Sequence, residues 1–412
     1  MTRRRILMVA YHFPPHAGSS GIQRTLRFAR TLPRYGWDPV ILSVAPFAYE
    51  QTSDALLADL PADVPIYRPW ALDAKRHLSL FGRYPGLFAR PDRWRSWWLP
   101  GVAAGLAATW RHRPEVIWST FPIATAHRIG ATLAGLTDLP WVADLRDPMA
   151  HDGYPQDAKL WTAYQKVERR VFATARAVVT VTPGCAAYYA NRYPDAAGRI
   201  HVIRNAHAPT DPGPPVARTD NDGGSDGRIT LLHSGIVYPW ERDPTALLQA
   251  IARLLAHDPR LDERLRVIFR APGDESWLRA KVAAAGVQTV VEVAPPLAYR
   301  AALEEMRRAS ALLLLQADNC NLQIPAKLYE YAYSGRPVLT LSDPAGETWR
   351  EATRLQLGPC ARLDEPVAIA ALIKGVLDQA LPAPPEVNGE DYENRSAALA
   401  SLLDRLAAPS RQ

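Results

Sequence analysis

Two charged side chains one helical turn apart are the strongest candidates for ligand binding in this 412-residue sequence. Lys327 and Glu330 follow an apolar segment, and a spacing of three residues places them on one face of a helix. A lysine at a helix start can bind a diphosphate together with free backbone N–H groups. A glutamate one turn later can accept hydrogen bonds from two ribose hydroxyls. The alternative is an exposed Lys–Glu pair on a solvated surface.

The residues around this pair predict the elements that hold it. Ala311–Gln316 is expected to be a buried strand. Pro325 would open a helix that Gly335 ends, and Pro337 would begin the next strand. In open parallel sheets, ligands bind at the carboxyl ends of the strands, where this loop and helix start are expected. The stretch Ile324–Val338 is therefore the predicted centre of a binding site.

A glycine-rich loop, HAGSSG at 16–21, follows the first predicted strand and precedes a predicted helix. Gly18 and Gly21 would let the backbone approach a phosphate, and Ser19 and Ser20 would add hydroxyl donors. The loop is not a GxGxxG sequence, and the chain contains no Walker motif, which argues against dinucleotide-binding proteins and NTPases. A simple turn is the alternative.

Charged residues also gather near two predicted elements of the first half of the chain. Asp144, Arg146 and Asp147 stand at the end of a predicted strand, where such groups often line a cleft. An Asp–Arg pair that fixes the loop is the structural alternative. Arg24 and Arg27, on the helix after the glycine loop, are expected either on a solvated surface or in contact with an acceptor phosphate.

Apolar β-branched runs alternate with helical patterns along the chain, which predicts βαβ units and parallel sheets. Residues 208–227 (APTDPGPPVARTDNDGGSDG) have the composition of a linker. We therefore predict an α/β protein with domains at residues 1–207 and 229–390 and a linker at 208–228. Apolar residues near helical spacing predict a closing helix within the tail, residues 391–412.

The order of these motifs resembles that of the retaining glycosyltransferases of family 4, in the bacterial surface-polysaccharide branch. The resemblance covers nearly the whole chain and implies the GT-B fold, in which two Rossmann-like domains face each other across a cleft. It implies transfer of a sugar from a nucleoside-diphosphate donor to an acceptor hydroxyl with retention, without a cofactor or an obligatory metal. The matching stretches are ILMVAYHFPPHAGSSGIQR, PWVADLRDP, AVVTVTPG, VIRNAH, LLHSGIVYPWERDPTALLQAI, IPAKLYEYAYSGRPV and ENRSAALASLLDRL.

The resemblance implies roles for residues in the second half. The family carries a Glu-x7-Glu pair at its donor site; Glu330 matches the second glutamate, whereas Leu322 stands at the first. Glu330 would hold the ribose. Lys327 and Arg242 would bind the diphosphate and stabilise charge on the leaving group. The loop before the helix offers polar candidates for contact with the sugar ring, which are Asp318, Asn319 and Asn321.

Other positions take roles by the same resemblance. Gly235 ends a strand at the donor site, Ile236 follows it where the family usually has an arginine, and Arg270 is a weaker phosphate candidate. The loop Gly18–Gly21 would flank the phosphates from the other domain, and Asp144 would face the acceptor. With no covalent nucleophile assigned, retention implies front-face attack assisted by the leaving phosphate.

Positive charge is concentrated in the N-terminal part of the chain, which predicts an anionic partner. Through Arg128 there are 17 Lys plus Arg against 8 Asp plus Glu, an excess of +9, in a chain of net charge +6. Arg68–Pro100 interleaves basic residues with tryptophans, which suits an anionic membrane surface and a lipid-phosphate acceptor. Tryptophans packed as core are an alternative. Nucleic acid is not the expected partner, because no nucleic-acid module is recognisable.

Several kinds of protein and site are excluded by the sequence. Cys185, Cys320 and Cys360 are too widely spaced for a disulfide framework or a zinc knuckle. The first apolar run is too short for a signal peptide, and no run is long enough for a membrane span. Asp220 and Asp222 fit a DxD metal motif but lie in the linker, so we expect no metal site. We predict a cytoplasmic protein, with a position at the inner face of the membrane.

Two other functions fit the same pattern. A nucleotide-sugar 2-epimerase shares the two-domain architecture and would form its product without an acceptor. A non-catalytic nucleotide-sugar-binding subunit is suggested by Leu322 at the position of the first glutamate, and it would bind without turnover.

Overall fold

The computed structural model describes residues 3–17, 21–60, 63–81, 83–152, 154–207 and 227–407. Three residues of the predicted phosphate loop, Gly18, Ser19 and Ser20, lie outside the described residues. Most of the predicted linker at 208–228 lies outside them as well.

The chain forms two compact units, each with its own sheet. Unit 1 comprises Met1–Ala208 and Asp391–Gln412, and unit 2 comprises Pro209–Glu390. Unit 1 is therefore built from two separate stretches of the chain. Within the described ranges, no helix is both long and apolar enough to span a bilayer.

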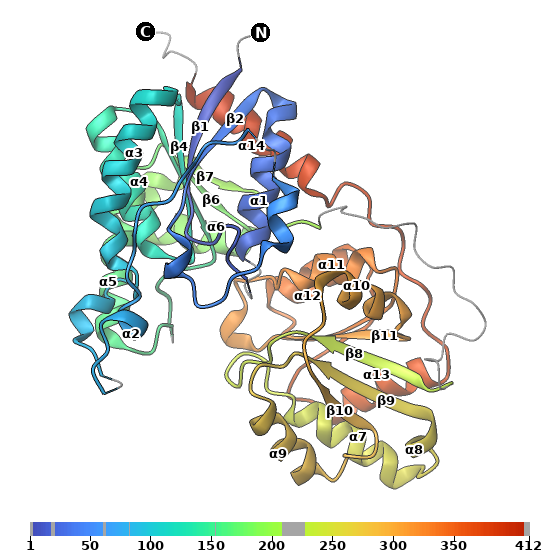
Figure 1. The fold of residues 1–412 in the computed structure, drawn as a ribbon. Helices are drawn as coiled ribbons and strands as arrows, with labels where there is room; N and C mark the ends of the chain where they lie inside the picture. The colour runs from blue at the N-terminus through green and yellow to red at the C-terminus, as the bar shows by residue number, and fades with distance from the viewer. Residues whose placement is uncertain are drawn as a thin grey trace. The chain divides into compact units, whose positions relative to one another are not determined.

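Unit 1 is organised around a parallel sheet of seven strands in the order β3-β2-β1-β4-β5-β6-β7 (Figure 1). Its central strands are near-continuous apolar runs rather than alternating ones, because helices cover both faces of the sheet. The strands are β1 (Arg4–Val9), β2 (Trp37–Leu42), β3 (Ile66–Tyr67), β4 (Val116–Thr120), β5 (Trp141–Arg146), β6 (Ala177–Thr180) and β7 (Ile200–Val202).

The last helix of the chain completes unit 1. The helices α1 (Gly21–Thr31) and α14 (Tyr392–Ala407) pack together over one face of the sheet, with the Phe28 and Tyr392 rings edge to face at 5.7 Å. The opposite face is covered by α3 (Trp98–His112) and α4 (Ala124–Thr137). Figure 1 shows α14, in red, beside α1 in blue. Unit 1 also contains α2 (Ala74–His77), α5 (Ala158–Thr174) and α6 (Pro183–Arg192).

Unit 2 has a parallel sheet of six strands in the order β10-β9-β8-β11-β12-β13, with an apolar core on each face. The strands are β8 (Ile229–Ser234), β9 (Leu265–Arg270), β10 (Val291–Ala294), β11 (Ala311–Leu315), β12 (Val338–Leu341) and β13 (Cys360–Ala361). The helices are α7 (Thr245–His257), α8 (Leu261–Arg264), α9 (Glu275–Ala285), α10 (Tyr299–Arg308), α11 (Lys327–Tyr333), α12 (Glu347–Arg354) and α13 (Pro366–Leu377).

The predicted strand–loop–helix–strand frame around Lys327 is present, with one correction. Gly335 has a φ of +71°, the left-handed conformation of a helix C-cap, as predicted. Pro325 was wrongly predicted to open the helix, because α11 begins at Lys327. The N–H groups of Leu328 and Tyr329 bond to carbonyls only three residues back, so the first turn is tighter than an α-helix. The two-residue strands β3 and β13 were not predicted, because such short runs carry no periodicity.

Candidate functional site

Lys327 lies directly against the backbone at the carboxyl end of β8. Gly235 follows β8 with a φ of +115°, a region that favours glycine. A Cβ atom on Gly235 would overlap the Nζ and Cε atoms of Lys327. The glycine is therefore needed both for its conformation and for the space in which the lysine ammonium lies.

The ammonium group of Lys327 is buried. Among the described residues, Nζ has no hydrogen-bond partner, although it is inaccessible to solvent. Burial, followed by repulsion from Arg242, lowers the pKa of Lys327 to about 7, and the charge of Glu330 opposes this shift. A buried cation in this state is costly unless an anion meets it. The site is therefore prepared for a negatively charged ligand.

Glu330 completes the charged group in α11. The side chain is half-buried, and burial raises its pKa, while Lys327 and a hydrogen bond with Tyr299 lower it in part. Lys327 is also half-buried. The pair is thus not the exposed surface pair considered as the alternative from the sequence.

Arg242 is held in place beside this group. One guanidinium nitrogen donates to the Ile236 carbonyl at 2.9 Å, and the guanidinium lies over the Tyr238 ring at 5.2 Å. Repulsion between Arg242 and Lys327 contributes to the low pKa of Lys327, so both cations act on one region. Arg270, the weaker phosphate candidate, instead forms an ion pair with Glu305, with Nε and Oε2 at 2.9 Å.

Two side chains that the sequence did not single out, Tyr331 and His233, tie β8 to α11 and to β11 respectively. The backbone N–H of Ser234 donates to the Tyr331 hydroxyl at 2.9 Å. His233 is buried, and its Nδ1 lies 2.9 Å from the Leu313 carbonyl. Burial and the nearby Lys327 charge hold the pKa of His233 well below its ordinary range, so it stays neutral. The sequence indicates these contacts only through the position of His233 near Gly235 and of Tyr331 beside Glu330.

The loop between β11 and α11 has mainly supporting contacts. Asn319, a predicted donor contact, gives its side-chain N–H to the Trp240 carbonyl at 2.8 Å and so braces the segment that carries Arg242. Asn321 donates to Asp343 at 2.6 Å. Asp318 lines a cavity of about 320 Å³ at the same edge of the sheet, which Lys327 and Glu330 do not line.

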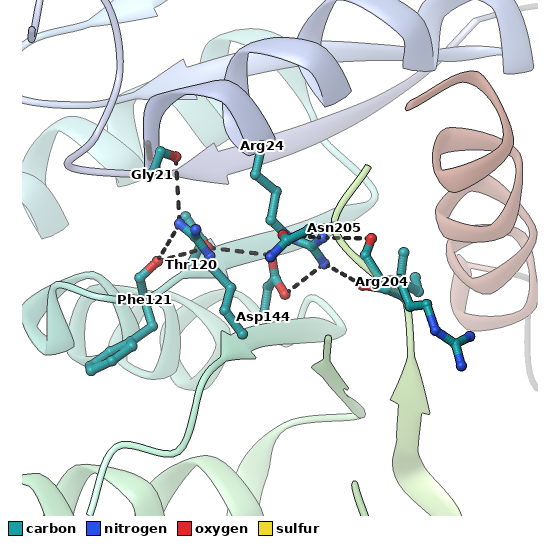
Figure 2. Close-up of polar contacts among 9 residues, drawn as sticks. Gly21, Arg24, Thr120, Phe121, Asp144, Arg204 and Asn205 are labelled. Carbon is teal, nitrogen blue, oxygen red and sulfur yellow. Dashed lines mark hydrogen bonds and ion pairs between the residues drawn. The ribbon is translucent and has the colours of Figure 1, made fainter. Parts of the chain in front are cut away.

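In unit 1, Arg24 and Asp144 form a fully buried ion pair (Figure 2). Arg24 is 1% exposed and Asp144 is 0% exposed. Two guanidinium nitrogens meet the two carboxylate oxygens at 2.7 and 3.0 Å. The remaining donors of Arg24 reach the carbonyls of Ile203 and Arg204 and the side chain of Asn205.

This network uses all five N–H donors of the Arg24 guanidinium. Burial alone would lower the pKa of Arg24, but the Asp144 carboxylate outweighs it and raises the pKa. Arg24 is therefore not a solvated surface residue. It joins α1 to the end of β5 and to the chain after β7, and Asp144 is its counter-ion.

Arg146 has the features expected of a ligand-binding arginine. It ends β5 at a β-bulge and has a φ of +59°, a strained conformation for a side chain other than glycine. Its guanidinium reaches the carbonyls of Gly21 and Phe121 only at 3.5 Å. Among the described residues, no carboxylate forms an ion pair with Arg146, and its Nε has no partner. Asp147 beside it is half-buried.

Gly21 and His12 lie against this arginine. A Cβ atom on Gly21 would overlap the His12 ring and approach the Arg146 guanidinium to 3.1 Å. Burial, followed by repulsion from His16 and Arg146, lowers the pKa of His12 well below its ordinary value. Sequence reasoning placed Gly21 in a phosphate loop but missed His12, since a lone histidine after a strand carries no pattern.

The part of the chain that the structure describes holds no group of three or more His, Cys, Asp or Glu side chains able to bind a metal ion. The groups that gather at the carboxyl ends of the strands are instead cations and hydrogen-bond donors. They are suited to phosphate groups and hydroxyls.

The first half of the sequence matches one known family model over residues 20–206. The model is that of the glycosyl transferase 4-like domain. Residues 20–206 are similar to that domain. A curated relative, the D-inositol 3-phosphate glycosyltransferase of Streptosporangium roseum, is 30% identical over 205 residues. That match covers 47% of this chain and 45% of the relative, so it spans less than half of either protein.

Solved glycosyltransferase structures share the fold of the whole chain. Anabaena HepE in complex with UDP-glucose has a TM-score of 0.61 at 15% identity, over 98% of this chain and 97% of HepE. Sucrose-phosphate synthase from Thermosynechococcus elongatus has a TM-score of 0.66 at 12% identity, over 98% and 96%. The two units, each with a parallel sheet between helices, are thus the Rossmann-like domains of the GT-B fold. The predicted fold class is confirmed.

Proposed function

We propose that this protein transfers a sugar from a nucleoside-diphosphate donor to an acceptor hydroxyl. The observation that carries this proposal is the buried ammonium of Lys327 against Gly235, beside Arg242 and Glu330, which has no hydrogen-bond partner among the described residues. A bound diphosphate supplies a negatively charged partner for the Lys327 ammonium, and a ribose supplies hydroxyls that donate hydrogen bonds to the Glu330 carboxylate. The glycosyl transferase 4-like match of residues 20–206 supports transfer rather than epimerisation or binding alone.

In this proposal the residues of unit 2 act on the leaving group. Lys327 and Arg242 bind the diphosphate and stabilise the negative charge that develops as the bond to the sugar breaks. Glu330 positions the nucleoside through its ribose, and Asn319 keeps the Arg242 segment in place. We propose retention through front-face attack, in which the leaving phosphate accepts the proton of the acceptor hydroxyl. No cofactor and no obligatory metal take part.

In unit 1 we assign Arg146 to the acceptor side, with Asp147 beside it. Its weakly bonded guanidinium suits a phosphate or a carboxylate of the acceptor. Asp144 and Arg24 act indirectly, because their mutual ion pair fixes the end of β5 from which Arg146 projects. We propose a glycan or lipid-phosphate acceptor, a role in surface polysaccharide or glycolipid synthesis, and a position at the cytoplasmic face of the membrane.

The experiment that tests this function begins with the donor. Because ligands that bind the native state raise the melting temperature, the purified protein is screened with UDP-, GDP- and ADP-sugars. The donor that stabilises it, for which UDP-glucose is the first candidate by analogy with the HepE complex, is then labelled in the sugar and incubated with bacterial lipid extract. We expect label in the acceptor with the anomeric configuration of the donor. A changed sugar nucleotide without acceptor would indicate an epimerase, and binding without turnover would indicate a non-catalytic subunit.

Replacing Glu330 by alanine should weaken nucleotide-sugar binding by about 10- to 100-fold, because a charge-assisted hydrogen bond to a hydroxyl is worth roughly 1.5–3 kcal/mol. Titration calorimetry with intact and 2′-deoxyribose forms of the donor measures this. The wild type should discriminate between the two forms, and the Glu330→Ala variant should not. Full discrimination in the variant would show that Glu330 does not contact the ribose.

Nucleotide-sugar affinity should fall as the pH rises above about 7, where free Lys327 loses its proton. A bound diphosphate favours the charged amine and raises this pKa, so binding takes up a proton above the pKa of the free state. The affinity then falls by up to about tenfold per pH unit. Titration between pH 6 and 9 checks this, and a Lys327→Arg variant, charged throughout, should show a flat profile. A flat wild-type profile would assign the site to another group.

A further inference from the structure

A stretch of unit 1 that lies between β3 and α3 along the chain carries apolar and basic side chains without any acidic ones. Residues 74–91, AKRHLSLFGRYPGLFARP, contain Lys75, Arg76, Arg83 and Arg90 and no Asp or Glu. The stretch begins with α2, which Figure 1 shows at the opposite side of unit 1 from α1 and α14. Such a stretch attracts anions and repels no part of a negatively charged surface.

The large apolar side chains of this stretch point into solvent. Phe81 is 96% exposed, Leu80 72%, Leu87 63% and Phe88 49%. Scattered exposed apolar residues are ordinary on protein surfaces, but here four large ones lie within nine residues of the chain, and we call these four side chains the apolar patch. Lys75, Arg76 and Arg83 are exposed in the same stretch.

Hydrogen bonds hold several of the described residues around this patch. Leu80 and Arg83 exchange backbone hydrogen bonds of 2.8 and 3.0 Å, with Phe81 at the turn between them in a left-handed conformation. Further along, a guanidinium nitrogen of Arg95 donates to the Leu87 carbonyl at 2.9 Å.

The base of the stretch is anchored to the body of unit 1. Asp73 caps α2 by accepting from the Lys75 N–H at 2.8 Å, and Ala74 N–H donates to the Arg93 carbonyl at 2.9 Å. The apolar tips are therefore presented outward from a fixed base rather than folded back into the core.

We propose that the described residues 78–81 and 83–88 insert into the interface of an anionic lipid bilayer. Leu80, Phe81, Leu87 and Phe88 would enter the boundary between headgroups and acyl chains, while Lys75 and Arg83 meet anionic headgroups. Aromatic and aliphatic side chains beside a cationic set are what interfacial membrane binding requires. This surface rests on the proposed function only in that it would bring the enzyme to a lipid-borne acceptor, and it is testable without donor or acceptor.

The test is flotation of the full-length protein with vesicles in the absence of sugar nucleotide. Vesicles of phosphatidylethanolamine with phosphatidylglycerol are compared with vesicles of phosphatidylcholine alone. We expect binding to the anionic vesicles, weak binding to the neutral ones, and loss of binding at high salt. A Leu80→Ser/Phe81→Ser variant should bind anionic vesicles at least about tenfold more weakly than the wild type, because two apolar side chains no longer enter the bilayer. An Arg83→Glu variant should lose the preference for anionic lipid.

The matched control is Trp110→Ser. Trp110 is 83% exposed but lies near the end of α3, where Arg5 at the start of β1 bonds to the His112 carbonyl. The Trp110→Ser variant should bind vesicles as strongly as the wild type. Because the substituted side chains are exposed, all variants should keep the wild-type melting temperature and nucleotide binding. Equal vesicle binding by the wild type and the Leu80→Ser/Phe81→Ser variant, or stronger binding to single-stranded DNA than to vesicles, would overturn the proposal while leaving the transferase assignment intact.

Discussion

A Lys327→Ala variant should lose transferase activity by about 100- to 1000-fold in kcat, the loss seen when one preorganised group that stabilises developing charge is removed. The same variant should melt at a higher temperature than the wild type in the absence of ligand. Its ammonium is buried without a hydrogen-bond partner among the described residues, and removing it relieves that cost. Opposite changes in activity and stability are the signature of a group kept for binding.

A Gly235→Ala variant tests whether activity depends on where the Lys327 ammonium lies, and not only on the presence of the lysine. The added methyl group would overlap Lys327 Nζ, so activity should fall although the lysine remains. If Gly235 affects activity through Lys327, the two substitutions should not add in their effect on the rate, and Gly235→Ala should change the rate little in a Lys327→Ala background. The melting temperature should still fall in both backgrounds, because alanine at a φ of +115° is strained. Single-turnover rates and melting temperatures of the four proteins measure this cycle. Full additivity, or wild-type activity in Lys327→Ala, would remove Lys327 from the reaction.

Replacing Arg24 by alanine should destabilise unit 1 by about 3–5 kcal/mol, because it leaves the Asp144 carboxylate buried without its counter-ion. The loss also includes the bonds to the carbonyls of Ile203 and Arg204. Guanidinium-induced unfolding followed by the tryptophan fluorescence of unit 1 measures the effect, with the transition of unit 2 treated separately.

The control is the double variant Arg24→Met/Asp144→Leu. Replacing a buried pair by apolar residues of similar size is far less damaging than breaking it, so the double variant should recover much of the loss. Its activity should stay low if the pair also positions Arg146. A small effect of Arg24→Ala would mean that water or another cation reaches Asp144.

The fold could be predicted because its signals are local. Runs such as VIW in β4 and ALLLL in β11 are apolar, and they begin where the strands begin. The glycine at 335 marks the end of α11 through its own backbone preference. Spacing along a helix also placed Lys327 and Glu330 on one face.

The state of the site could not be predicted in the same way, because it depends on contacts between distant residues. Asp144 is 120 positions from Arg24, and no local pattern distinguishes a buried arginine from a surface one. The low pKa of Lys327 arises from its burial against Gly235 and from Arg242, both far away in sequence. The strain at Arg146 arises from a bulge in the pairing of β5 with β6. Each required the tertiary structure.

The return of α14 to unit 1 bears on the order in which the protein can mature. During synthesis, unit 2 emerges from the ribosome complete, whereas unit 1 still lacks the helix that covers Phe28 and its neighbours. The usual succession, in which the N-terminal domain folds first, is thus reversed for the final step. The apolar face of α1 stays uncovered until α14 has been synthesised. A nascent protein stalled before residue 391 would therefore expose this face to chaperones.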